Sequence, residues 1–113
     1  MILSTVGSEA DAARLSRLWV EDRRAACVTR IDGATSVYSW QGEIEEETEI
    51  LLLVKTSVSD ETELAELLAS MAEDHPYDQP EFLVFAPESG APGYLEWVQA
   101  WCHDGTGPTE GGS

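Results

Sequence analysis

A histidine flanked by carboxylates is the first residue whose surroundings suggest metal chemistry. His75 lies in the segment Asp74-His-Pro-Tyr-Asp78, and neighbouring carboxylates orient the rings of ligating histidines in many proteins. The alternative is a structural histidine that hydrogen-bonds a backbone carbonyl group and fixes a turn. Pro76 favours this second interpretation because proline restricts the backbone of the residue before it. His75 is therefore a candidate metal ligand with a structural alternative.

Lys55, the only lysine of the chain, is the second candidate. It follows an apolar run, where a lysine can extend its charged head to the surface and pair with a carboxylate such as that of Glu81. The functional alternative is a cation at a cleft between subunits that attracts an anionic ligand. Trp40 and Tyr77 suit the lining of such a cleft, although aromatic residues more commonly pack in cores and interfaces. Lys55, Trp40 and Tyr77 are thus the candidate residues of a small-ligand cleft.

Glutamates at positions 43, 45, 47 and 49 alternate with other residues. In a regular strand all four stand on one side, with Glu46 on the other. A linear row does not converge like the roughly 6–8 oxygen ligands of Ca²⁺, so we expect a solvated face. Cys27 is expected to be a small apolar core residue. Cys102-His103 are adjacent, and adjacent ligands do not readily form a closed metal site alone.

The charge of the chain argues against two classes of partner. The 113 residues include 22 Asp+Glu and 6 Lys+Arg, which gives a formal net charge of −16. Nucleic acids and anionic membranes bind through Lys and Arg, so we expect neither as a partner. Without a signal peptide or an apolar run of about 20 residues, the chain is predicted to be cytoplasmic. Its acidic, lysine-poor composition suits a salt-rich cytoplasm. We predict no catalysis, because nucleophilic and nucleotide motifs are absent.

Periodicity and turn signals divide the chain into strands and helices. An apolar strand over residues 1–6 precedes a helix that is capped by Ser8 and has two arginines near its end. Strands are predicted over residues 25–40, with a bend or bulge at Asp32-Gly33, and through 50–54 after a hairpin turn at Gln41-Gly42. A second helix, capped by Ser59, must stop by His75. A strand over residues 81–86 and a short helix over 94–101 follow.

This order is β-α-β-β-α-β plus a terminal helix, which predicts an α+β fold of the ferredoxin-like sandwich type. Residues 1–104 are expected to form one domain, and the Gly-rich residues 105–113 a disordered tail. In that fold both helices cover one face of the sheet and leave the other bare. The long strands are expected to place apolar residues on both sides of the sheet, namely Val37, Trp40, Ile50, Leu52 and Val54. A bare apolar face of this size predicts oligomerisation through the sheet.

Six segments of the sequence together resemble one protein family. They are Arg24-Ala-Ala-Cys-Val28, Gly33-Ala-Thr-Ser-Val-Tyr-Ser-Trp40, Gly42 with the following Glu-Ile-Glu, Leu53-Val-Lys-Thr56, His75-Pro-Tyr77 with Pro80-Glu81, and Tyr94-Leu-Glu-Trp97. In this order and spacing they resemble the CutA family of divalent-cation tolerance proteins. The resemblance implies a ferredoxin-like fold, a tight homotrimer like that of PII-like signalling proteins, and the binding of divalent metals, chiefly copper. It implies no established catalytic activity.

The ligand positions depart from those that the resemblance implies. In bacterial members the implied copper ligands are a cysteine late in the first strand and two successive histidines before Pro-Tyr, where this chain has Ser4 and Asp74-His75. A carboxylate from Asp74 with an imidazole from His75 suits Cu(II), Zn or Mn better than Cu(I). We therefore predict a homotrimer that binds divalent cations through His75 and Asp74. The alternatives are a PII-like effector-sensing or scaffold trimer, with a small ligand in the cleft between subunits, and a purely structural trimer.

Overall fold

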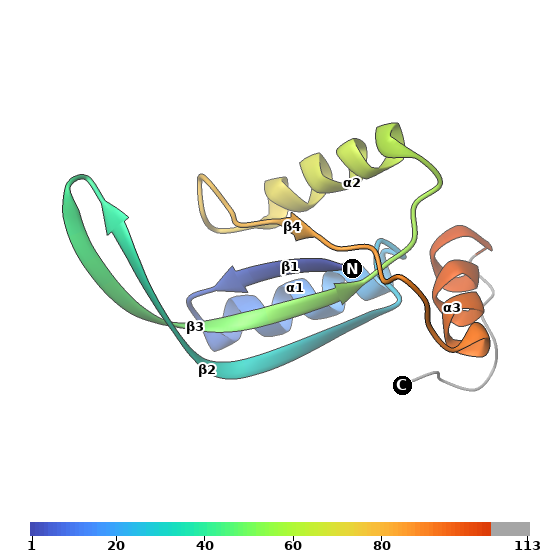
Figure 1. Ribbon diagram of the computed structural model, residues 1–113, viewed down its shortest axis with the longest axis horizontal. Coiled ribbons are helices and arrows are strands. Elements are labelled where there is room, and N and C mark those ends of the chain that lie inside the picture. Colours follow the sequence, from blue (N-terminus) through green and yellow to red (C-terminus); the bar gives the residue numbers. More distant parts are fainter. Residues whose placement is uncertain (105–113) are drawn as a thin grey trace.

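The computed structural model describes residues 1–104 of the chain (Figure 1). The predicted tail, residues 105–113, lies outside the described residues. The elements are β1 (Ile2–Val6), α1 (Glu9–Glu21), β2 (Cys27–Trp40), β3 (Glu43–Lys55), α2 (Glu61–Asp74), β4 (Leu83–Val84) and α3 (Pro92–Gln99), which continues as a π-helical turn over Ala100–Asp104. Within residues 1–104 no helix is both long and apolar enough to cross a bilayer.

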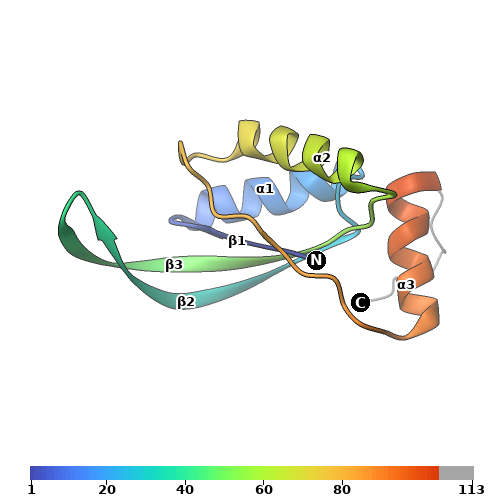
Figure 2. The same ribbon diagram turned by 45° about the horizontal axis from the view of Figure 1, so that its top comes forward.

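The four strands form one antiparallel sheet in the order β2-β3-β1-β4. Helices α1 and α2 lie side by side on one face of this sheet, and α3 stands at one end of it (Figure 2). The opposite face carries no helix. This arrangement confirms the predicted α+β, ferredoxin-like fold with an additional C-terminal helix.

The core lies between the sheet and the two helices. Helix α1 begins at an N-cap, Ser8, whose hydroxyl oxygen accepts a hydrogen bond from the backbone N–H of Asp11 at 3.1 Å. Its buried stripe packs against the strands, because residues spaced by three or four lie on one helix face. The fully buried core residues include Leu15, Trp19, Leu52, Val54 and Met71.

Several element boundaries differ from the sequence prediction. Helix α1 ends at Glu21, so the two arginines follow the helix, and Arg23 adopts a positive φ of 59°. Asp60 rather than Ser59 caps α2, through a 2.8 Å hydrogen bond from the N–H of Glu63. Strand β4 covers only Leu83–Val84 rather than 81–86, because just these two residues pair with β1. The terminal helix begins at Pro92, which supplies the fixed φ of a first helical turn.

Strands β2 and β3 form a long hairpin, of which only one half lies under the helices. The turn at Gln41-Gly42 has φ values of 49° and 82°, the conformation of a two-residue hairpin loop. A β-bulge lies between Ile31 and Ala34, as the sequence predicts at Asp32-Gly33. Beyond this bulge, residues 34–49 form an arm that projects from the body of the molecule (Figure 1). The molecule measures 47 × 28 × 26 Å along its principal axes, and the arm extends along the longest of them (Figure 1).

The bare face is less uniform than the sequence predicts. Ile50, Leu52 and Val54 all point into the core, so none of them lies on the bare face. Their neighbours Leu51 and Leu53 are half-buried and occupy the opposite face, as strand alternation requires. The exposed apolar side chains of the sheet and the arm include Ile31, Val37, Trp40, Ile44, Leu83 and Val84, and Phe85 directly after β4 is also exposed. An apolar face is therefore present. Of the residues predicted to be apolar on the sheet, Trp40 pairs with Glu43 and shares the side of Leu51 and Leu53, whereas Val37 pairs with Glu46 on the other side of the arm.

Candidate functional site

His75 links the end of α2 to strand β1. Helix α2 ends at Asp74, because Pro76 disfavours helical geometry at His75, whose ψ is 139°. The imidazole is 7% exposed, its Nε2 lies 2.9 Å from the carbonyl oxygen of Thr5, and its Nδ1 accepts a hydrogen bond from the N–H of Tyr77 at 3.1 Å. This pair of contacts requires a neutral ring with the proton on Nε2. The ring therefore offers no free lone pair to a metal ion.

Burial also governs the protonation of His75. Desolvation lowers the pKa of the imidazole, while the carbonyl group of Thr5 acts in the opposite direction. The edge of the ring lies against Phe82, with the two ring centroids 5.8 Å apart. Both ring nitrogens and the ring itself are thus in contact with other residues. These contacts match the alternative in which His75 is a structural residue that fixes the turn after α2.

Asp74, the second expected metal ligand, ties α2 to the segment around α1. Its Oδ2 accepts a hydrogen bond from the indole N–H of Trp19 at 3.1 Å and lies 2.7 Å from a guanidinium nitrogen of Arg24. A buried tryptophan needs such a partner for its N–H group. A metal ion at Asp74 and His75 would have to displace these contacts. Within residues 1–104, no group of three or more His, Cys, Asp or Glu side chains is placed to hold a metal ion.

Ser4 occupies the position at which the resemblance implies a cysteine ligand. Its side chain is fully buried on the core side of β1, between Ile2 and Val6. Among the described residues its hydroxyl group has no hydrogen-bond partner. This position thus faces the core beneath the helices, away from solvent.

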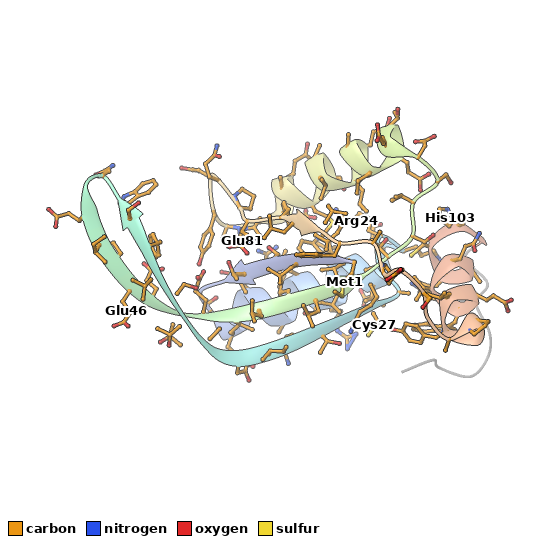
Figure 3. The ribbon with its side chains drawn as sticks, in the orientation of Figure 1. Met1, Arg24, Cys27, Glu46, Glu81 and His103 are labelled. Atoms are coloured by element: carbon orange, nitrogen blue, oxygen red, sulfur yellow. The ribbon has the colours of Figure 1, made fainter. Side chains whose placement is uncertain are left out.

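A cavity of about 720 Å³ lies between the arm and the segment that follows α2, and we call it the acidic cleft. Its carboxylates are those of Glu45, Glu47, Glu49 and Glu81, and its aromatic residues are Tyr38, Trp40 and Tyr77. None of its described lining residues is Lys or Arg. Strand β3 is regular, so the four alternating glutamates share one side and Glu46 lies on the other, as predicted. Figure 3 shows Glu46 on the arm and Glu81 on the segment before β4.

Two phenols of the acidic cleft face carboxylates. Glu49 is 8% exposed, and its Oε2 accepts a hydrogen bond from the hydroxyl group of Tyr77 at 3.3 Å. Burial, and then the charge of Glu49, raise the pKa of Tyr77 to about 12. A hydrogen bond to Glu47 raises the pKa of Tyr38. Both phenols therefore remain neutral donors at neutral pH, and the cleft keeps a negative charge.

The three residues expected to line a small-ligand cleft do not meet within one chain. Trp40 and Tyr77 both line the acidic cleft, whereas Lys55 lies at the end of β3, opposite Cys27 on β2. The ammonium group of Lys55 donates to the hydroxyl group of Thr29 and lies 3.9 Å from Sγ of Cys27. The expected ion pair with Glu81 is absent among the described side chains, because Glu81 belongs to the acidic cleft.

The cysteines occupy two different surroundings, and both are free. Cys27 is half-buried on the bare face, beside Lys55, rather than in the core as predicted. Counting residues back from the hairpin turn, across the bulge, would have paired Cys27 with Lys55. Cys102 lies 3.6 Å from the hydroxyl oxygen of Thr56, and Nε2 of His103 lies 3.1 Å from the hydroxyl oxygen of Ser57. The two neighbours Cys102 and His103 thus contact different side chains.

Comparison with known proteins places this architecture in a family. Residues 1–101 match the family described as CutA1 divalent ion tolerance protein. The divalent-cation tolerance protein CutA of Pectobacterium atrosepticum is 41% identical over 100 residues, which cover 88% of each chain. The Cut A1 structure from Thermus thermophilus has a TM-score of 0.78 and 40% identity, and covers 87% of this chain and 92% of its own.

A further similar structure is named a PII-like protein. It is the apo form of CutA from Nostoc sp. PCC 7120, which has a TM-score of 0.78 and 31% identity over 90% of this chain and 95% of its own. The names of these three relatives refer to tolerance of divalent cations or to PII-like proteins. The family match and the identities over most of the chain agree with the six sequence segments. The chain belongs to the CutA1 divalent ion tolerance family.

Proposed function

We propose that this protein gives tolerance to divalent cations by binding them at the acidic clefts of a homotrimer. The observation that carries the proposal is that Glu45, Glu47, Glu49 and Glu81 line one cavity, with no Lys or Arg among its described lining residues. In a chain of net charge −16, this cavity concentrates negative charge where two neutral phenols can add oxygen ligands. Carboxylate-rich sites suit Mn²⁺, and an added imidazole would suit Cu²⁺ or Zn²⁺.

Assembly would complete the ligand set. The described part of one chain holds no group of three potential ligands close enough for a metal, so the proposal requires ligands from a second copy. The arm carries the glutamates and also exposes apolar side chains, with Val37 65%, Trp40 59% and Ile44 75% exposed. An isolated two-stranded ribbon is marginally stable in water at best, and exposed apolar surface of this kind marks an interface. A neighbouring subunit is its natural support.

Equilibrium dialysis with Cu²⁺, Zn²⁺ and Mn²⁺ tests the proposal. The variant Glu45→Gln/Glu47→Gln should weaken uptake about tenfold or more, because it removes two charges from the cleft while keeping the side-chain shapes. Glu46→Gln is the matched control, since Glu46 lies on the other side of the same strand. An equal loss in the control, or no stoichiometric binding to the wild-type protein, would contradict the proposal.

The same assay decides the part played by His75 and Asp74. His75→Gln and Asp74→Asn are compared only after circular dichroism has shown that each variant is folded. If His75→Gln abolishes Cu²⁺ uptake while the cleft variant retains it, the cation binds at the end of α2 instead. Light scattering should report three chains per particle, and a monomer at micromolar concentration would contradict the assembly.

An effector-binding role is the second candidate function. It is favoured by the state of Lys55, whose ammonium group contacts only the uncharged side chains of Thr29 and Cys27 among those described. A half-buried cation without an anionic partner is available to a negatively charged ligand. One similar structure carries the name PII-like protein, and PII-like proteins are the class in which we expected an effector.

A further inference from the structure

Lys55 is exceptional among the cations of this protein. The chain has 22 Asp and Glu residues and one lysine, yet among the side chains of residues 1–103 no carboxylate oxygen lies within 4.0 Å of Nζ of Lys55. Four of the five arginines, by contrast, form ion pairs with Asp or Glu. The fifth, Arg23, stacks on the ring of Trp101 at 3.8 Å. Burial without a counter-ion is unfavourable for a charge, so the missing anion is the feature to explain.

Lys55 lines a cavity of about 500 Å³ between the end of the sheet and α3, which we call the Lys55 cavity. Met1 and Cys27 lie at this end of the sheet (Figure 3). The walls of the cavity are mainly apolar and include Met1, Phe85, Leu95 and Val98. In the single chain Phe85 is 48% and Leu95 42% exposed, so both present apolar surface at the cavity. Lys55 is the only Lys or Arg among the described lining residues, and none of these is Asp or Glu.

We propose that the Lys55 cavity binds a small molecule with one carboxylate group and an apolar body. The carboxylate pairs with the ammonium group of Lys55, and the apolar body lies against Phe85 and Leu95. The volume lies within the range of about 300–1,000 Å³ of small-molecule sites, which combine apolar walls with a few polar groups. One cationic side chain suits a singly charged head group, because the net charge of −16 repels a multiply charged anion more strongly.

The inference rests on the second candidate function and is separate from cation tolerance, because Lys55 does not line the acidic cleft. It also differs from the cleft expected from the sequence, since Trp40 and Tyr77 do not line the Lys55 cavity. The ligand is defined by its chemistry alone, as a carboxylate on an aliphatic or aromatic body. Octanoate is a suitable probe, and 1-octanol is its uncharged counterpart of the same chain length.

Isothermal titration calorimetry on the full-length protein in its native assembly tests the site. We expect octanoate to bind about tenfold or more tightly than 1-octanol, which is the usual size of a hydrogen bond to a charged group. Lys55→Met should remove this preference, and Lys55→Arg should retain it. Arg17→Met is the control for net charge, because Arg17 is an exposed residue of α1 outside the cavity. Leu95→Trp should weaken both probes by filling the cavity.

Three results would overturn the inference. They are equal binding of octanoate and 1-octanol to the wild-type protein, an octanoate affinity that Lys55→Met leaves unchanged, and no binding of either probe to the wild-type protein. Dialysis of Lys55→Met against Mn²⁺ separates this outcome from that of the cation proposal. Metal uptake should be unchanged in this variant, whereas a wild-type protein without metal uptake would contradict cation tolerance and leave the carboxylate site standing.

Discussion

The β2–β3 hairpin consists of two halves that share their strands but not their surroundings. In the half on the body side of the bulge, Leu52 and Val54 are fully buried beneath the helices. In the arm the same two strands continue without a helix, and Ile44 is 75% exposed. Both halves have a regular ladder on either side of one bulge. Hydrogen bonding alone therefore does not distinguish them, and the difference lies in the apolar surface that each half can cover within its own chain.

This contrast shows which part of the hairpin is stabilised by packing within its own chain and which part is not. The packed half has a core on one face, which is the usual support of a short strand. The arm has paired backbone groups but no core, so its apolar residues have no cover within residues 1–104 of the same chain. The two proposed sites follow the same division. The acidic cleft uses side chains of the arm, whereas the Lys55 cavity uses side chains at the packed end of the sheet.

The largest expected difference is between truncation in the packed half and truncation in the arm. Leu52→Ala should lower the free energy of unfolding by about 2–5 kcal/mol, because it leaves a cavity in a fully buried site. Urea unfolding followed by tryptophan fluorescence measures this change. Ile44→Ala should instead favour dissociation on dilution, seen by sedimentation. The comparison fails if Ile44→Ala unfolds the chain as strongly as Leu52→Ala.

A smaller effect is expected at the tip of the arm. Gly42 has a φ of 82° in the hairpin turn, and a side chain in this left-handed conformation costs about 1–2 kcal/mol. Gly42→Ala should therefore speed hydrogen exchange of the arm amides by about tenfold, with the packed half unchanged. Gly93→Ala is the matched control. Gly93 lies in α3 with open space around it, so alanine there should stabilise the protein by about 0.5–1 kcal/mol.

The buried hydroxyl group of Ser4 gives a test within the packed half. Ser4 is fully buried and its Oγ has no hydrogen-bond partner among residues 1–104. Ser4→Ala removes this unsatisfied group, so we expect the free energy of unfolding to rise by about 1 kcal/mol. Thermal unfolding measures the change, and Ser36→Ala on the exposed arm should have almost no effect. A loss of stability in Ser4→Ala would contradict the expected gain.

The pH dependence associated with His75 is expected to be the smallest effect. Because burial holds the pKa of folded His75 below its usual value of 6.5, the unfolded chain takes up a proton first as the pH falls. The free energy of unfolding should therefore decrease as the pH falls through about 6.5, down to the pKa of the folded state. His75→Gln should remove this part of the slope in urea titrations with EDTA present. His103→Gln should leave it in place.

The elements could be predicted from sequence because local signals determine them. The stripe of apolar residues in each helix, the paired signals at Asp32-Gly33 and Gln41-Gly42, and the proline after His75 each act within a few residues. The length of β4 could not be predicted, because it depends on how far the chain runs beside β1. Asp60 and Ser59 are both suitable N-cap residues and are adjacent in the sequence, so the sequence pattern alone does not show which of them caps α2.

The candidate site was less predictable because it depends on contacts between distant segments. The partners of Asp74, Trp19 and Arg24, lie 55 and 50 positions away in the sequence. No local pattern announces that both nitrogens of His75 are already bonded. The alternating glutamates were recognised as a row, but the cavity that they line also needs the chain between α2 and β4. Sequence periodicity predicts which side chains share one face of a strand or helix. It does not predict which distant segment of the chain packs opposite that face to enclose a cavity.

The bulge between Ile31 and Ala34 has a consequence for how the arm can vary. One strand there is a residue longer than the strand beside it, so the ribbon is obliged to bend whichever side chains it carries. The direction in which the arm points is thus set by backbone length. Changes in the residues along the arm can therefore alter its surface chemistry without altering the direction in which it points. Deleting Gly33 would have the opposite result, with the same chemical groups carried on a straighter ribbon that points in another direction.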